Sequence, residues 1–249
     1  MTDNQRGIFL VTGGSRGIGA ACALRAARDW PVAIFYRERA DEAEQVVRTI
    51  EKAGGTALAI QADVGDEESL MRGFEAVDRA GPLAVLINNA GVTGGVSRVD
   101  AVTVAALQDV YSVNVIGAFL AAREAVRRMS TRQGGQGGAI VNISSGASVL
   151  GSPNNWVHYA ASKGAIDTMT IGLSKEVAAE GIRVNAVRPG LVDTEIQRGR
   201  SAEQLQKMIN AVPLGRMGTV EEIADAVVWL ASPAAGYVTG CLLDARGGL

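Results

Sequence analysis

Residues 8–19 read Ile-Phe-Leu-Val-Thr-Gly-Gly-Ser-Arg-Gly-Ile-Gly, a short apolar run that ends in a glycine-rich turn. The run predicts a β-strand over Ile8–Thr12, and a helix is expected to begin within the turn, at Ile18. Glycines permit a tight turn and let backbone N–H groups approach an anion, and a helix N-terminus adds a positive dipole end. The arrangement therefore predicts a diphosphate site, although the spacing is G-x3-G-x-G and a purely structural turn is the alternative.

Outward from this stretch, short apolar runs alternate with longer helical patterns along the chain. Most of the runs are continuously apolar, which is typical of parallel strands that are covered on both faces. The repetition predicts right-handed crossovers and an α/β, Rossmann-type, doubly wound domain that spans residues 1–249. The expected strands are Ile8–Thr12, Val32–Tyr36, Ala57–Gln61, Leu83–Asn88, Ala139–Ile143, Ile182–Val187 and Leu242–Asp244. The expected helices are Ile18–Asp29, Ala40–Ala53, Glu67–Ala80, Ala105–Arg132, His158–Glu180 and Val220–Ala231.

The residues after the second strand bear on which dinucleotide is bound. Dinucleotide folds place an Asp or Glu there for the ribose of NAD, or an Arg nearby for the 2′-phosphate of NADP. Here Tyr36 occupies that position, Arg37 follows it, and Arg16 of the glycine turn would face the same region. Two guanidiniums with no acidic residue at the strand end favour NADP over NAD. The alternative is that Arg37 and Arg39 are ordinary solvated charges.

Composition and charge exclude several classes of protein. The chain has 249 residues, 47% of them hydrophobic, and a formal net charge of -2 without a basic stripe, which argues against disorder and against nucleic-acid binding. The N-terminus lacks the layout of a signal peptide and no apolar run approaches the roughly 20 residues of a membrane span, so we expect a cytoplasmic protein. Two cysteines and a single histidine leave no disulfide framework and no multi-histidine metal site.

Three further segments complete a recognisable set. They are Asn-Asn-Ala-Gly at 88–91, Ser-Ser at 144–145 and Tyr-Ala-Ala-Ser-Lys at 159–163. Together with the turn at 12–19, they resemble the short, single-domain branch of the short-chain dehydrogenase/reductase family, from the first strand to the last glycines. The resemblance implies a seven-stranded parallel sheet in the order 3-2-1-4-5-6-7 with helices on both faces.

The tyrosine and lysine of the last segment carry the expected chemistry. Tyr159 and Lys163 are four residues apart, so they share one helix face. A neighbouring ammonium lowers the pKa of a phenol from about 10, so that Tyr159 exchanges a proton with a substrate oxygen near neutral pH. The resemblance implies these roles, and it adds that Ser145 hydrogen-bonds the same oxygen and that Asn114 holds a water that links Lys163 to solvent. We choose Ser145 over Ser144 because the family's serine lies closer to the tyrosine.

The resemblance also implies the cofactor contacts. They are Gly13, Ser15, Arg16, Gly17, Ile18 and Gly19 at the diphosphate; Arg37 at the 2′-phosphate; Asp63 and Val64 at the adenine; Asn89, Ala90 and Gly91 at the adenosine ribose; Tyr159 and Lys163 at the nicotinamide ribose; and Pro189, Gly190, Val192 and Thr194 at the nicotinamide. Asp63 has a second interpretation as a turn cap. Trp156, His158 and Glu195 are expected at the substrate pocket, and residues 193–212 resemble the family's lid.

The sequence thus predicts reversible hydride transfer between NADP(H) and a small-molecule ketone or secondary alcohol, without a metal. The alternatives are an NAD-dependent sugar or alcohol dehydrogenase, a 3-oxoacyl-carrier-protein reductase and a non-catalytic NADP-binding sensor. The resemblance implies a homotetramer, with a dimer as the alternative. Arg246 stands where many relatives carry an acidic residue, so contacts at the C-terminus are not inherited from the family.

Overall fold

Seven strands form one sheet in the computed structural model, which describes residues 7–197 and 200–249. The strand order is β3-β2-β1-β4-β5-β6-β7, and neighbouring strands pair in parallel. This order confirms the fold class that the sequence predicts. The strands are β1 (Ile8–Thr12), β2 (Val32–Tyr36), β3 (Ala57–Gln61), β4 (Leu83–Asn88), β5 (Gly138–Ile143), β6 (Ile182–Pro189) and β7 (Leu242–Ala245).

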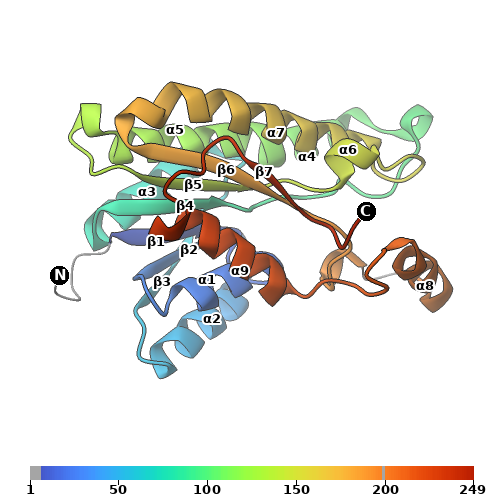
Figure 1. Cartoon of the computed structure of the whole chain (residues 1–249), viewed down its shortest axis with the longest axis horizontal. Helices are drawn as coiled ribbons and strands as arrows, with labels where there is room; N and C mark the ends of the chain where they lie inside the picture. The colour runs from blue at the N-terminus through green and yellow to red at the C-terminus, as the bar shows by residue number, and fades with distance from the viewer. Residues whose placement is uncertain (1–6, 198–199) are drawn as a thin grey trace.

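Helices cover both faces of the sheet (Figure 1). Helices α1, α2 and α9 lie on one face, and α3, α5 and α7 lie on the other, with α4 beside them. The helices are α1 (Gly17–Ala26), α2 (Ala40–Lys52), α3 (Glu67–Ala80), α4 (Val104–Tyr111), α5 (Ala118–Met129), α6 (Ala147–Leu150), α7 (Val157–Val177), α8 (Ala202–Ala211) and α9 (Val220–Ala231).

Strand side chains supply two separate apolar layers. Successive residues of a strand point to opposite faces, so β1 sends Phe9 and Val11 to the layer beneath α1 and Leu10 to the layer beneath α3. Both layers are fully covered, because Phe9, Leu10 and Val11 have no exposed surface. The continuous apolar runs of the sequence therefore reflect burial on two sides.

Helix α8 lies outside these two layers, beyond the end of the sheet (Figure 1). It begins at a capping box in which the Ser201 hydroxyl accepts from the Gln204 N–H and the Gln204 side chain accepts from the Ser201 N–H. The sequence analysis expects this region, residues 193–212, as a lid and does not predict the helix. Residues 198–199 of that lid lie outside the described residues.

The predicted helix over 105–132 is interrupted. A π-helical turn, η2 (Ser112–Gly117), separates α4 from α5, and a 3₁₀ turn, η3 (Thr131–Gln133), follows α5. Hydrophobic periodicity does not reveal such a turn, because the residues on either side keep a helical pattern. Single π turns inside helices occur frequently at functional sites, and Asn114 lies within this one.

The stretch Val104–Met129 is long and apolar enough to cross a membrane by length and composition alone, with a mean hydropathy of 1.4. It is the one such helix among residues 7–197 and 200–249, and the sequence analysis does not foresee it. In the structure α5 packs against β4, α3 and α7. Because the core helix of a globular domain passes the same test, this helix is weak evidence for a membrane span.

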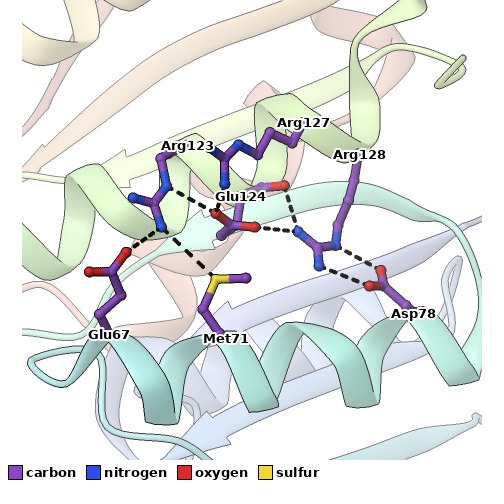
Figure 2. Close-up of polar contacts among 7 residues, drawn as sticks. All are labelled: Glu67, Met71, Asp78, Arg123, Glu124, Arg127 and Arg128. Carbon is purple, nitrogen blue, oxygen red and sulfur yellow. Dashed lines mark hydrogen bonds and ion pairs between the residues drawn. The ribbon is translucent and has the colours of Figure 1, made fainter. Parts of the chain in front are cut away.

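A buried carboxylate joins α5 to α3 (Figure 2). Glu124 is 1% exposed, and its carboxylate accepts hydrogen bonds from Arg123, Arg127 and Arg128 at 2.8–2.9 Å. Arg128 also forms a bidentate pair with Asp78 of α3. Burial raises the pKa of Glu124, but the hydrogen bonds and charges of the three arginines outweigh it, so the pKa lies below its usual value.

We predict that Glu124→Gln lowers the free energy of unfolding by about 2–3 kcal/mol at pH 7, because a neutral amide at this buried position loses the charge-assisted hydrogen bonds with the three arginines. The folded-state pKa of Glu124 is lowered, so its stabilisation is lost as the pH falls through that pKa. The difference between wild type and variant should therefore narrow below about pH 4. Urea unfolding at pH 7 and at low pH measures both effects.

Glu68→Gln is the matched control. Glu68 pairs with Arg72 at 3.8 Å on the exposed surface of α3, where an ion pair contributes at most about 1 kcal/mol. Equal destabilisation by the two substitutions at pH 7 would show that the α3–α5 network does not stabilise the fold.

Candidate active site

The strand order reverses at β1, which lies between β2 and β4. At such a switch point the loops after the two strands diverge and leave a crevice outside their carboxyl ends. β1 ends at Thr12 and β4 at Asn88, while β5 and β6 end at Ile143 and Pro189 along the same edge. The segments that the sequence singles out therefore meet at one edge of the sheet.

The glycine turn after β1 has the backbone that its residues require. Gly13 and Gly17 have φ of 65° and 54°, a region that side chains with a Cβ rarely adopt. Gly19 is needed for a different reason. A Cβ at Gly19 would lie 2.3 Å from the Gly13 carbonyl oxygen and 2.5 Å from Asn89 Nδ2, so the turn packs tightly against the start of α1.

Asn89 and Thr12 hold the two sides of the switch point together. The Asn89 carboxamide donates to the carbonyl oxygens of Thr12 and Gly13, each at 2.9 Å. The Thr12 hydroxyl accepts from the backbone N–H groups of Asn89 and Ala90, each at 3.0 Å. The loop after β4 is therefore fixed to the glycine turn by four hydrogen bonds.

The glycine turn leads directly into the start of α1. A Cβ placed on Gly17 would touch only Thr194 Cγ2, at 3.9 Å, so Thr194 of the lid segment lies beside the turn. Helix α1 begins at this point, with no acidic residue in its first turn and no side-chain cap from Arg16. Ser15 and Ile18 flank the same turn. The Arg16 side chain does not cap the N–H groups at the start of α1, and an uncapped helix N-terminus favours an anion.

Three arginines surround the expected position of the adenosine ribose, and each pairs with a carboxylate. Arg16 forms a hydrogen bond and ion pair with Glu195 of the lid segment. Arg39 pairs with Glu42 at 2.6 Å and lies 3.8 Å from the same Glu195 carboxylate. Arg37 pairs with Glu38 at 3.0 Å on the surface. Glu195 therefore joins Arg16 and Arg39, while Arg37 pairs with its neighbour in the chain.

Tyr159 and Ser145 form the centre of the site. Tyr159 lies in the first turn of α7, and Ser145 lies two residues after β5. Their hydroxyl groups are joined by a hydrogen bond, and the Ser145 hydroxyl also accepts from the Ala147 N–H at 3.1 Å. Ser144 is turned away, because its hydroxyl donates to the Lys163 carbonyl oxygen at 3.2 Å. The geometry thus favours Ser145 over Ser144 as the partner of the tyrosine.

Lys163 is buried beside the tyrosine. Its side chain is 4% exposed, its ammonium donates to the Ile143 carbonyl oxygen at 2.7 Å, and Nζ lies 5.7 Å from the centre of the Tyr159 ring. Burial lowers the pKa of Lys163 to about 8, and the charge of Asp167, one turn further along α7, opposes this change. The ammonium is therefore close to its titration range at neutral pH.

Burial raises the pKa of the Tyr159 phenol, and the hydrogen bond with Ser145 opposes the change. This direction is opposite to the one that the sequence predicts from the neighbouring ammonium. The physical reason is that burial removes the phenolate from water, and the free energy lost in this way exceeds the stabilisation that the surrounding protein groups give to the phenolate. Tyr159 is therefore present as the neutral acid at pH 7.

Asn114 is the fourth polar residue of this group and is 1% exposed. Its carboxamide accepts from the Val92 N–H at 2.8 Å and donates to the Val92 carbonyl oxygen at 2.9 Å and to the Ser162 hydroxyl at 3.0 Å. A Cβ on Gly91 would lie 3.3 Å from Asn114 Oδ1 and 3.5 Å from Lys163 Nζ. Asn114 and Lys163 therefore both border Gly91.

Asp63 and Val64, the two residues expected at the adenine, have different surroundings. The Asp63 carboxylate accepts from the Gly65 N–H at 2.8 Å, as a turn cap does. With Arg37 and Ser112 it also lines an open cleft of about 310 Å³. The Val64 side chain is buried in the apolar layer beneath α3. Asp63 thus combines a structural bond with a place at the cleft.

The expected nicotinamide contacts follow β6. Pro189 accepts from the Gly146 N–H at 2.8 Å, which ties this strand end to the Ser145 loop. Gly190 must be glycine, because a Cβ there would lie 2.7 Å from the Arg246 Cα. Val192 is 4% exposed and packs in the layer beneath α9, so its side chain supports the segment from below.

The three residues expected at the substrate pocket lie in different places. The Trp156 ring meets the Tyr159 ring edge-on at 6.2 Å, so it forms a wall beside the phenol. His158 is buried and its Nε2 lies 2.9 Å from the Thr93 carbonyl oxygen, which fixes the loop after β4. The Glu195 carboxylate faces Arg16 and Arg39.

The sequence analysis does not place two arginines at the site, Arg200, which it does not name, and Arg246, which it links only to contacts at the C-terminus. Arg200 of the lid segment stacks on Trp156, with its guanidinium carbon 4.9 Å from the ring centre. Arg246 lies against Gly146, and a Cβ on that glycine would be 2.7 Å from Arg246 Cδ. A motif search does not find either residue, since both come from segments without a motif. Surplus arginine in the lid segment is the one signal that the sequence offers.

Metal chemistry has no support in the described residues. No group of three or more His, Cys, Asp or Glu side chains that could hold a metal ion occurs among residues 7–197 and 200–249.

Comparison with known proteins decides the family. A family model described as "Enoyl-(Acyl carrier protein) reductase" matches residues 13–249. The protein named "Uncharacterized oxidoreductase YgfF" of Escherichia coli (strain K12) is 50% identical over 244 residues, which cover 97% of this chain and 99% of that protein. The chain belongs to the short-chain dehydrogenase/reductase family of oxidoreductases.

More distant relatives carry different substrate names. The 3beta-hydroxysteroid dehydrogenase 1 of Eggerthella lenta is 37% identical, over 100% of this chain and 96% of that protein. A 3-oxoacyl-[acyl-carrier-protein] reductase, FabG, of Staphylococcus aureus is 36% identical, over 96% of each. At nearly equal identity, the short-chain dehydrogenase/reductase relatives do not single out one substrate.

Solved structures of family members superpose closely. A blue fluorescent protein from a metagenomic library, in complex with NADPH, gives a TM-score of 0.90 at 33% identity and covers 99% of both chains. A short-chain dehydrogenase from Burkholderia cenocepacia J2315, in complex with NADP, gives 0.91 at 34% identity and covers 99% of both chains. Both likenesses extend over the entire sheet and the site edge.

Proposed function

We propose that this protein is an NADP(H)-dependent oxidoreductase that transfers hydride reversibly between the nicotinamide and a ketone or secondary alcohol. One observation carries the proposal. The Tyr159 phenol is hydrogen-bonded to Ser145, with the Lys163 ammonium buried beside it, at the same sheet edge as the glycine turn. The NADPH and NADP complexes of the two solved family members support the choice of cofactor.

When bound, the nicotinamide cofactor supplies or accepts the hydride at the carbonyl carbon. The protein manages the proton and the charge on oxygen. In the reducing direction, Tyr159 donates its phenolic proton to the carbonyl oxygen as that oxygen gains electrons, and Ser145 donates a hydrogen bond to the same oxygen. The reverse reaction returns the proton to Tyr159.

We propose that Lys163 stabilises the phenolate that Tyr159 becomes, and that Asn114 helps to replace the proton that Tyr159 has donated. The Lys163 ammonium, fixed by the Ile143 carbonyl oxygen, favours the phenolate that forms. Because Lys163 Nζ and Asn114 Oδ1 both border Gly91, a water between them could return a proton toward the tyrosine. Asn114 itself is fixed by Val92 and Ser162, so it orients such a water and does not ionise.

Charge around the adenosine ribose supports NADP over NAD. Arg16 and Arg39 lie within reach of one carboxylate, that of Glu195, and Arg37 follows β2 directly. We propose that Arg16 and Arg37 bind the 2′-phosphate, since guanidinium groups are suited to phosphate. Gly13, Gly17 and Gly19 would cradle the diphosphate at the uncapped start of α1.

Other activities in the family use the same catalytic residues. An NAD-dependent sugar or alcohol dehydrogenase would lack a use for the arginines after β2. A 3-oxoacyl-carrier-protein reductase needs basic residues that hold an acidic carrier protein, and α7 ends in Lys175, Glu176 and Val177, which is not basic. A non-catalytic sensor would have no use for the hydrogen-bonded Tyr159 and Ser145 pair.

We predict that Tyr159→Phe lowers turnover of a ketone with NADPH by about 10²- to 10⁴-fold, because it removes the acid that protonates the substrate oxygen. Binding of NADPH, measured by its fluorescence, should be retained. A panel of keto-esters, sugars, steroids, quinones and acyl thioesters, followed by NADPH absorbance, supplies the substrate. Tyr237→Phe, at a fully exposed tyrosine, is the control. Wild-type turnover by Tyr159→Phe would refute the catalytic assignment.

We predict that Glu195→Gln tightens NADPH binding about two- to fivefold, because it removes a carboxylate that competes with the 2′-phosphate for Arg16. NADH, which lacks that phosphate, should gain less. Fluorescence titration of both cofactors measures the difference, with Glu203→Gln on the exposed face of α8 as the control. Tighter binding of NADH than of NADPH by the wild type would contradict the proposed cofactor.

We further propose a homotetramer in the cytoplasm, built in part on the face of α4, η2, α5 and α7. This face exposes large apolar side chains, and exposed apolar patches mark protein interfaces. They are Val104, Tyr111, Ile116, Phe119 and Ile171. Light scattering of the purified protein should give four chain masses, and Phe119→Glu should reduce that number. A monomer at micromolar concentration would exclude the assembly.

A further inference from the structure

Two donor groups beside Tyr159 have no acceptor. Arg200 donates from Nε to the Gln197 side chain at 3.1 Å, but its Nη2 is buried and has no hydrogen-bond partner among the described residues. The indole Nε1 of Trp156 is likewise buried and has no partner among residues 7–197 and 200–249. Buried polar groups in folded proteins are almost always hydrogen-bonded, so a partner from outside the chain is expected here.

The two donors form one unit against the catalytic tyrosine. The Arg200 guanidinium carbon lies 4.9 Å from the centre of the Trp156 ring, and that ring lies 6.2 Å from the Tyr159 ring. Trp156 therefore lies between Arg200 and Tyr159, and it contacts both. A ligand whose carbonyl rests on Tyr159 would have its far end at Trp156 and Arg200.

The nearest acidic side chain of the lid segment does not neutralise Arg200. The Glu195 carboxylate pairs with Arg16 and Arg39 on the cofactor side, and Arg200 forms no ion pair among the described residues. The Trp156 face holds the guanidinium by a cation–π contact, which leaves its charge uncompensated. A structural arginine would not be expected to keep a desolvated N–H without an acceptor.

We propose that Arg200 and Trp156 bind a carboxylate of the substrate, so that the preferred substrates are oxo acids rather than neutral ketones. One positive charge and two free N–H donors match the single charge and two oxygens of a carboxylate. The inference rests on the proposed reduction of a carbonyl at Tyr159 and names the substrate class of that same site. Arg200 is then a specificity-determining residue that takes no part in proton transfer.

The test uses matched acids and esters. 4-Acetylbenzoate and 5-oxohexanoate are each compared with their methyl esters, so that only the charge at the far end changes. In the wild type, kcat/KM for the acids should exceed that for the esters about ten- to a hundredfold, as expected for a charge-assisted hydrogen bond. The preference should appear in KM, because the carboxylate contact is the same in the ground and transition states.

Variants separate recognition from folding. Arg200→Gln should bring the ratio of acid to ester close to one, Arg200→Lys should keep part of the preference, and Trp156→Phe should weaken it. Lys207→Gln removes an exposed positive charge from the same lid segment and should leave the ratio as in the wild type. Equal losses on acid and ester in Arg200→Gln would assign Arg200 a structural role and overturn the inference.

A binding measurement separates this inference from the proposed function. Calorimetric titration of the NADP⁺-loaded protein with 4-acetylbenzoate and its methyl ester involves no turnover, and the acid should bind at least tenfold more tightly through Arg200. Reduction of the ketones without an acid preference overturns the inference alone. Arg200-dependent binding of the acid without reduction of any ketone overturns the proposed function alone. No measurable binding of the acid also overturns the inference.

Discussion

The hydrogen bonds of Asn89 and Thr12 hold the switch point in one geometry. They join the loop after β4 to the glycine turn after β1, so both sides of the crevice move as one body. The turn in turn depends on Gly19, where any side chain would strike the Gly13 carbonyl. Without these hydrogen bonds, the position of the start of α1 relative to the loop that contains Gly91 would not be fixed. The proposed cofactor cradle and the catalytic group are therefore parts of one rigid edge.

That rigid edge contrasts with the way the lid segment is held. The first residue of the lid, Asp193, is held by a backbone hydrogen bond to Gly218. Beyond it, side chains connect the lid to the site through Glu195 with Arg16 and through Arg200 with Trp156. Of these two side-chain contacts, the first faces the cofactor side and the second faces the substrate side. Exposed ion pairs and cation–π contacts are individually weak, so a ligand that offers a stronger partner can displace either one.

The sequence predicted the strands and most helices where one physical property, such as burial on both faces, determined the pattern of residues. Continuous apolar runs placed the strands, since side chains on both faces of a parallel strand are buried. The ordered motifs placed Tyr159, Lys163 and Ser145 at one edge. In the structure Ser145 hydrogen-bonds Tyr159, and Lys163 Nζ lies 5.7 Å from the centre of the Tyr159 ring. The π turn at η2 was missed because its residues keep a helical periodicity, and Arg200 was missed because its contact with Trp156 joins segments far apart in the chain. The pKa of Tyr159 was given the wrong direction because desolvation cannot be seen in a sequence.

The π turn at η2 has a consequence for insertions and deletions. It holds Asn114 in place and leads directly into α5, the helix that carries Glu124. Removing one residue from the turn would restore an α-helical register and rotate everything after it by about 100°. Asn114 would lose Val92 and Ser162. Arg123 and Arg128 of α5 would turn away from Glu67 and Asp78 of α3. The number of residues in this one turn thus determines both the position of Asn114 and the contacts between α5 and α3.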